Sequence, residues 1–150
     1  MFRVSCIQLC SSNDVENNFK KTKRLVIKAV KQKTDFILTP EVSSKISLDK
    51  KKLLKSAVTM EKDFYIRGIK SLARKYKKWI LIGSLILKDK KNKLVNRSVL
   101  ISPSGNINCF YDKIHMYDAK LSKKEKYFES KLFKSGNKIK IAKLPWGKLG

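Results

Sequence analysis

A strand, a helix and a second strand follow one another within residues 2–41, and this order constrains the fold more than any other feature. Residues 2–9 (FRVSCIQL) alternate in polarity and include β-branched side chains, which is typical of a strand. Residues 35–41 (DFILTPE) are a short apolar run that ends at Pro40. Two strands joined through a helix usually run parallel, so the chain predicts an α/β fold with a parallel sheet.

The segment between these strands has the marks of an amphipathic helix. It begins after SSND, where Asn13 followed by Glu16 is close to a capping box. Apolar or small side chains then recur at helical spacing: Val15, Phe19, Thr22, Val26, Ala29 and Val30. Lysines gather at the predicted C-terminus of the helix, where they suit the helix dipole.

The remaining residues predict a second helix and several strands. Residues 42–59 are polar and predict a loop that leads into a helix over 60–77, with an apolar stripe of Tyr65, Ile69, Leu72, Ala73 and Tyr76. Strands are expected at 79–87 (WILIGSLIL), 94–102 (LVNRSVLIS) and 107–113 (INCFYDK). Because short turns separate these three, we expect neighbouring strands in an antiparallel meander.

The end of the sequence predicts further strands. Residues 138–145 (KIKIAKLP) alternate in polarity, and Leu149–Gly150 resemble the start of another strand. A length of 150 residues suits a single domain. We expect residues 1–150 to be the N-terminal part of one larger α/β domain, because its last predicted strand only begins at the final residues.

The net charge is +24, from 36 basic and 12 acidic residues. So basic a chain suggests a polyanionic partner. Only five of the basic residues are arginines, the residue best suited to bidentate contacts with bases and phosphates, and the lysines are spread over the whole length. We therefore interpret most lysines as solvated and expect no specific nucleic acid. The alternative is a non-catalytic basic module that binds RNA or another polyanion.

Apolar runs and cysteines indicate a cytoplasmic protein. The longest apolar run, Trp79 to Leu87, is too short to span a membrane, and the first ten residues lack the long apolar centre of a signal peptide. Of the three cysteines, Cys6 and Cys10 are predicted on one face of a strand, where we expect them to fill the core. His115 is the only histidine, so no metal site is expected.

Two residues are candidates for chemistry because of their positions. Glu41 follows a strand directly after Pro40, at the edge where open α/β sheets bind ligands, and could act as a general base. Lys113 follows the strand 107–112 and could stabilise an oxyanion. The alternative is that both are solvated loop residues. His115 could be a base, although a lone histidine is more often structural.

Five segments occur in the order and spacing of the nitrilase superfamily of carbon–nitrogen hydrolases: DFILTPE, NRSVLISPSGNI, YDKIHMYD, YFESKLFKSGNKI and LPWGKLG. This resemblance extends from the first strand to Gly150. The pattern DKIHMYD followed by ES…F…G is most similar to the branch of omega-amidase and deaminated glutathione amidase. The resemblance implies an α-β-β-α sandwich, of which this chain would form the N-terminal half.

The resemblance also implies a Glu–Lys–Cys triad without a metal or organic cofactor. Glu41 matches the general base and Lys113 matches the lysine that steadies the tetrahedral intermediate. Glu129 matches a second glutamate that orients the site or binds substrate, and His115 becomes a supporting residue. The nucleophile of the family lies a few residues beyond GKLG, so none of the three cysteines matches it, and residues 1–150 alone are expected to be inactive.

The implied reaction converts a small carboxylate-bearing amide to an acid and ammonia through a cysteine thioester. Family members usually form homo-oligomers. A further alternative is that the chain is a non-catalytic remnant that pairs with another hydrolase chain.

Two departures from the family pattern leave the substrate open. Thr39 replaces the usual aliphatic residue before Pro-Glu, and the segment EVSSKIS lacks the aromatic residues often found after the glutamate.

Overall fold

The computed structural model describes residues 2–47, 49–122 and 125–150. Five strands form its main sheet, in the order β1 (Val4–Cys6), β2 (Phe36–Leu38), β3 (Trp79–Lys88), β4 (Leu94–Ile101) and β5 (Ile107–Asp112). Strands β1, β2 and β3 run parallel, whereas β3, β4 and β5 run antiparallel. The predicted parallel unit and the predicted meander are both confirmed.

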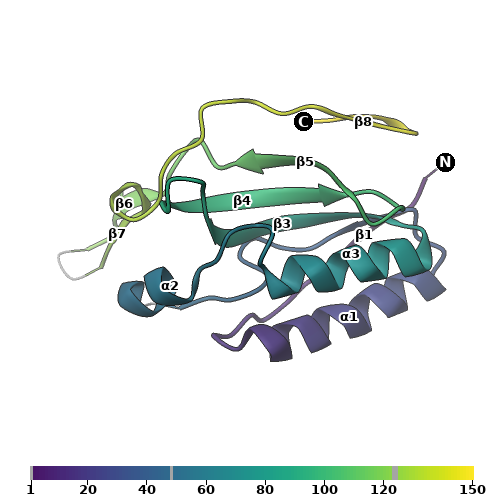
Figure 1. The fold of residues 1–150 in the computed structure, drawn as a ribbon, viewed down its shortest axis with the longest axis horizontal. Helices are drawn as coiled ribbons and strands as arrows, with labels where there is room; N and C mark the ends of the chain where they lie inside the picture. Colours follow the sequence, from purple (N-terminus) through teal and green to yellow (C-terminus); the bar gives the residue numbers. More distant parts are fainter. Residues whose placement is uncertain (1, 48, 123–124) are drawn as a thin grey trace.

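Two helices, α1 (Val15–Lys31) and α3 (Phe64–Tyr76), lie side by side on one face of the sheet (Figure 1). The side chain of Asp14 caps α1 by accepting a hydrogen bond from the N–H of Asn17 at 3.0 Å. The predicted cap, Asn13, is wrong by one residue. A carboxylate at this position meets the positive end of the helix dipole as well as a free backbone donor.

The main core lies between these helices and the sheet. Most of the predicted stripe of α3 is buried, including Tyr65, Ile69, Leu72 and Ala73. These side chains belong to one cluster with Val26 of α1 and with the buried residues of β3 and β4 that face them. Within the described ranges, no helix combines the length and apolar character that crossing a membrane requires.

Smaller elements surround the sheet. A short helix, α2 (Lys50–Ser56), lies in the region 42–59, and β6 (Asp118–Lys120) pairs with β7 (Lys126–Phe128) next to the 3-10 turn η1 (Glu129–Lys131). The hairpin of β8 (Ala142–Leu144) and β9 (Gly147–Leu149) lies over the sheet face that α1 and α3 leave uncovered (Figure 1).

The strand predicted over 138–145 is wrong outside Ala142–Leu144. Ile139 and Ile141 are 81% and 65% exposed. An extended segment becomes a strand only where a neighbour accepts its backbone hydrogen bonds. Among the described residues, a partner strand for this part of the chain begins only opposite Ala142.

The prediction that Cys6 and Cys10 fill the core is also wrong, since both are exposed. The buried neighbour Ile7 points toward the helices, and successive strand residues point to opposite faces. Cys6 therefore points to the face without helices, on a strand at the edge of the sheet. Cys10 lies beyond the end of β1, and Cys109 is half-buried.

Candidate functional site

Glu41 lies in a turn that follows β2, at the carboxyl end of the parallel strands. Hydrogen bonds from backbone N–H groups hold this turn against β3 on both sides of the glutamate. The N–H of Thr39 donates to the carbonyl of Leu81 at 3.0 Å, and the N–H of Val42 donates to Oγ of Ser84 at 2.9 Å. The position of the Glu41 backbone is therefore set by β3.

Val42 has a left-handed backbone with a φ of 51°. A β-branched residue rarely adopts this conformation, which costs on the order of 1–3 kcal/mol and persists only where the surroundings enforce it. Here the bonds from the Val42 N–H and from the Ser43 N–H to Ser84 enforce it. Val42 directly follows Glu41, so the strained backbone lies next to the residue that carries this carboxylate.

Lys113 follows β5 at the same edge of the sheet. Its N–H donates to the carbonyl of Asn96 at 2.8 Å, and its carbonyl accepts from the N–H of Gly136 at 2.9 Å. Its ammonium Nζ lies 3.2 Å from Oε1 of Glu41 and 2.9 Å from Oε2 of Glu129. One ammonium thus joins two carboxylates that come from distant parts of the chain.

Glu129 begins the turn η1, directly after β7. Besides the contact with Lys113, its Oε2 accepts a hydrogen bond from the N–H of Tyr117 at 2.9 Å. The N–H of Glu129 in turn donates to the carbonyl of Tyr117 at 3.2 Å. These bonds connect the loop after Lys113 to the start of η1, and they fix the carboxylate that faces the ammonium.

The two carboxylates raise the pKa of Lys113. Burial by itself would lower the pKa of this ammonium, but the hydrogen bonds to Glu129 and Glu41, with the charges of both, outweigh burial. The pKa therefore lies above its ordinary value, and the side chain is a stable cation at neutral pH. A permanent positive charge suits the stabilisation of an oxyanion and excludes a role as proton acceptor.

The three side chains differ in their access to solvent. The side chain of Glu41 is 58% exposed, whereas those of Lys113 and Glu129 are each 26% exposed. The exposed carboxylate is the one that an incoming group can reach. Glu129 is positioned to hold the ammonium from the other side.

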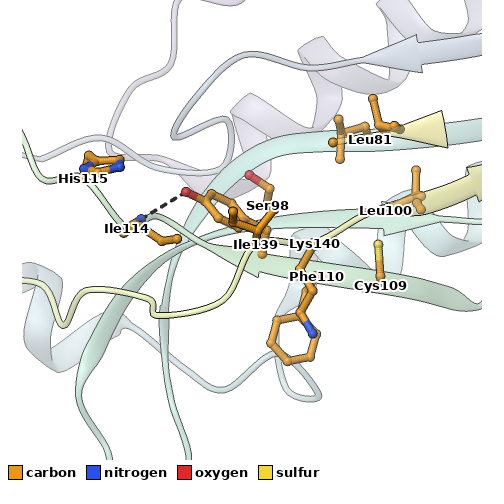
Figure 2. Close-up of a pocket in the computed structure, with 13 residues that line it drawn as sticks. Leu81, Ser98, Leu100, Cys109, Phe110, Ile114, His115, Ile139 and Lys140 are labelled. Atoms are coloured by element: carbon orange, nitrogen blue, oxygen red, sulfur yellow. Dashed lines mark hydrogen bonds between the residues drawn. The ribbon is translucent and has the colours of Figure 1, made fainter.

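A cavity of about 500 Å³ lies next to this cluster, between the sheet and the C-terminal segment (Figure 2). Its lining is mostly apolar, with Leu81, Leu100 and Ile139 among the residues drawn. The three charged side chains do not line it. Ile114 and His115, directly after Lys113, do line it, so it begins beside the cluster.

His115 lies at one end of this cavity and is exposed (Figure 2). Its neighbour Ile114 donates its N–H to the hydroxyl oxygen of Tyr111 at 3.1 Å, the bond marked by the dashed line. In the described residues, His115 has no hydrogen bond with Glu41, Lys113 or Glu129. It therefore borders the cluster without joining it.

Cys109 also lines the cavity. Burial raises the pKa of its thiol, although the charge of Lys140 opposes this effect, so the neutral thiol is favoured. Cys109 precedes Lys113 by four residues of an extended chain, a separation of roughly 13 Å. Within the described ranges, no thiol forms a hydrogen bond with the three charged side chains. The cluster thus contains candidates for a base and an oxyanion stabiliser but no nucleophile.

Sequence reasoning missed several residues that build this cluster. Asn96 is 3% exposed and donates from Nδ2 to Oε1 of Glu41 at 2.8 Å. Its signal is visible in the sequence, because Asn96, Arg97 and Ser98 interrupt an otherwise apolar strand. Gly136 was missed in this role, although the pattern ES…F…G contains it. A β-carbon there would lie 2.1 Å from the carbonyl oxygen of Asp112, so only glycine can pack beside the backbone that leads into Lys113.

Comparisons with known proteins show the family to which this chain belongs. The family model described as Carbon-nitrogen hydrolase matches residues 3–150. A deaminated glutathione amidase from Dictyostelium discoideum is 33% identical over 155 residues, which cover 99% of this chain and 53% of that protein. Omega-amidase NIT3 from Saccharomyces cerevisiae is 26% identical and is matched over 99% of this chain and 53% of its own length. The chain thus spans about half the length of these relatives.

Solved structures show the same fold. The NitFhit protein of Caenorhabditis elegans superposes with a TM-score of 0.86 at 29% identity, over 100% of this chain and 38% of that one. Nit3 of Saccharomyces cerevisiae, described as a member of branch 10 of the nitrilase superfamily, gives a TM-score of 0.82 at 19% identity. That match covers 98% of this chain and 53% of Nit3. The sheet, the helix layer and the C-terminal hairpin therefore have a nitrilase-type fold.

Proposed function

Because this chain belongs to the carbon–nitrogen hydrolase family, we propose that the complete protein hydrolyses a small carboxylate-bearing amide to an acid and ammonia. The observation that carries the proposal is the ammonium of Lys113 between the carboxylates of Glu41 and Glu129. The names of two relatives, deaminated glutathione amidase and omega-amidase, support an amide as the substrate.

In this proposal the nucleophile is a cysteine that follows Gly150 in the complete protein. Glu41 accepts the proton of its thiol, and the resulting thiolate attacks the amide carbon, because the thiolate is the reactive form. The exposed carboxylate of Glu41 is accessible to such a thiol. Glu41 then donates this proton to the amide nitrogen; the carbon–nitrogen bond breaks, ammonia departs and a thioester remains.

Lys113 stabilises the negative charge that develops on the amide oxygen. A preorganised donor of this kind lowers the barrier by roughly 3 kcal/mol. Glu129 holds the ammonium in place through its contact at 2.9 Å. In the second half of the reaction Glu41 activates a water molecule, which hydrolyses the thioester and releases the carboxylic acid. A substrate anion would be attracted to a chain with a net charge of +24, although salt screens this beyond about 10 Å.

Ammonia release from a panel of small omega-amides tests the proposal with the full-length protein. We expect Glu41→Gln and Lys113→Ala each to abolish release while the circular dichroism spectrum stays unchanged. The matched controls are Glu16→Gln in the first turn of α1 and Lys120→Ala in β6, both exposed, which should keep full activity. Near-normal turnover in either site variant, or a coding sequence without a cysteine shortly after Gly150, would refute the proposed roles.

One observation favours the polyanion alternative. Helix α1 carries six basic residues and one acidic residue, and α3 carries four basic residues and none that is acidic. None of these cations forms an ion pair within the described residues. Filter binding of RNA over a range of salt concentrations separates the two functions, because phosphate contacts give a steep dependence on salt. Weak RNA binding with a shallow dependence on salt would exclude the polyanion function and leave only the proposed hydrolase.

A further inference from the structure

We propose that Asn96 is a positioning residue that holds Glu41 and Lys113 in register and selects which oxygen of Glu41 acts as the base. This inference rests on the proposed function. Asn96 belongs to β4, one residue before Arg97, and is 3% exposed. A polar side chain is not needed to form the core at this point of β4, because the preceding residues Leu94 and Val95 are buried and hydrophobic.

Asn96 contacts both members of the pair with different atoms. Its Nδ2 donates to Oε1 of Glu41 at 2.8 Å, and its backbone carbonyl accepts from the N–H of Lys113 at 2.8 Å. A movement of Asn96 would therefore displace the carboxylate and the ammonium together. The Asn96 side chain must present its nitrogen to Glu41. With its oxygen there instead, two hydrogen-bond acceptors would face each other without a proton between them.

The two oxygens of Glu41 are made unequal by this arrangement. Oε1 accepts from Nδ2 of Asn96 at 2.8 Å and from Nζ of Lys113 at 3.2 Å. Within the described residues, Oε2 has no hydrogen-bond donor. A carboxylate oxygen that already accepts two hydrogen bonds is a poor acceptor for a further proton. Oε2 is therefore the oxygen that takes the proton of the nucleophile.

Asn96 itself is held rigidly. It is paired with Ile86 on β3, and the next residue, Arg97, is paired with Asp112 on β5. Arg97 and Asp112 form a two-pronged ion pair, with Nε to Oδ1 at 2.6 Å and Nη2 to Oδ2 at 2.9 Å. Side chains alternate between faces along a strand, so this pair lies on the face opposite Asn96 and Lys113. The ion pair thus secures the strand register that brings Asn96 beside Lys113.

A neutral amide suits this task better than the alternatives. Aspartate would place a second negative charge against Glu41, and a cation would weaken Glu41 as a base. Leucine has a similar size but lacks the donor, so Asn96→Leu removes the hydrogen bond with little change in volume. Asn108→Leu is the matched control, because it makes the same change at an exposed position of the neighbouring strand β5.

The first arm of the test measures steady-state kinetics of the full-length enzyme. We expect Asn96→Leu to lower kcat about 10- to 100-fold while KM changes less than about threefold, since misplacing a reacting group by 1 Å costs rates of this order. A purely structural role would lower the melting temperature without this separation of kcat from KM. Asn108→Leu should change neither kcat nor KM.

The second arm is structural and does not depend on turnover. In a crystal structure of Asn96→Leu, the Glu41 carboxylate should shift by about 1 Å or occupy more than one position. If Asn96→Leu fails to fold, Asn96→Ala replaces it in both arms. If the wild-type protein hydrolyses no amide, the proposed function fails, and the crystal structure alone decides the positioning role. An unmoved carboxylate, or an unchanged kcat, would overturn the inference.

Discussion

A β-carbon on Gly83 would lie 2.2 Å from the carbonyl oxygen of Thr39, nearer than such atoms approach in proteins. Gly83 also donates its N–H to Oγ1 of Thr39 at 3.2 Å. The contact falls within the irregularity of β3, where pairing with β4 shifts between Ile82 and Leu85. The absence of a side chain at this point of β3 lets the turn that carries Glu41 pack directly on the strand.

Gly83→Ala should therefore disrupt both the fold and the placement of Glu41. The atoms that the new methyl group would meet belong to the backbone of Thr39 and Pro40, which cannot rotate away. We expect the free energy of unfolding to fall by about 3 kcal/mol, at the upper end of overpacking effects. Urea denaturation followed by circular dichroism measures this change.

Gly68→Ala is the control for this prediction. Its β-carbon would meet the ring of Phe19 at 2.3 Å, and this ring is a side chain that can move. Alanine also favours the interior of helix α3 by about 1 kcal/mol over glycine, which offsets part of the cost. The loss of stability should be clearly smaller than in Gly83→Ala. Equal losses would show that the backbone contact at Gly83 has no special role.

Glu129→Gln should lower the pKa of Lys113. The hydrogen bond and the charge of Glu129 both raise this pKa, and glutamine removes the charge while keeping the shape of the side chain. Side-chain NMR of Lys113 over an alkaline titration measures the effect. Glu125→Gln, at the exposed position directly before β7, is the control and should leave the pKa of Lys113 unchanged. An unaltered titration in Glu129→Gln would mean that the contact at 2.9 Å does not persist in solution.

Lys77→Gly should stabilise the protein. Lys77 ends α3 in a left-handed conformation with φ 53° and ψ 46°, which costs a residue with a side chain roughly 1–2 kcal/mol. Glycine accepts this conformation, so we expect a gain of about 1 kcal/mol in the free energy of unfolding after its greater backbone entropy is included. Lys75→Gly makes the same change within the helix and should lose about 1 kcal/mol. A loss of stability in both variants would contradict the assignment of the helix end.

Tyr65→Phe should make the protein less sensitive to alkali. Burial raises the pKa of the Tyr65 hydroxyl to about 12, although hydrogen bonds to Thr22 and Ser43 oppose this. In the unfolded chain this pKa is about 10, so the stability contributed by the neutral hydroxyl is complete below pH 10 and is lost as the pH rises toward 12. The phenylalanine variant has no hydroxyl and does not lose stability in this way. The raised pKa of Lys113 also contributes stability that is lost at high pH, but it does so equally in the wild-type protein and the variant.

Urea midpoints at pH 8, 10 and 11 measure this difference. At pH 8 the variant should be less stable by about 1 kcal/mol, because Tyr65 and Thr22 lose their hydrogen bond of 2.7 Å. This difference in stability between the wild-type protein and the variant should become smaller at pH 11. A constant gap across the three values would show that Tyr65 does not titrate differently in the folded and unfolded chains.

The elements of the fold could be predicted where burial follows a simple period. The strands around Ile80, Val99 and Phe110 were predicted almost to the residue, because each is a mostly apolar or alternating run between turns. The stripe of α3 was predicted because that helix buries one face over several turns. The cysteines of the first strand could not be placed in this way. A period of two shows that a strand has two faces, but only the packing of α1 and α3 decides which face is covered.

The sequence by itself determined where the longer strands and helices form and that Glu41 and Lys113 each follow a strand, because these properties depend on neighbouring residues. Only the tertiary structure decided that Lys113 meets a glutamate 72 residues earlier and another 16 residues later. It also decided that Asn96 contacts both partners of one of these pairs. Such contacts depend on strand order and register across the sheet, and local periodicity carries no information about either.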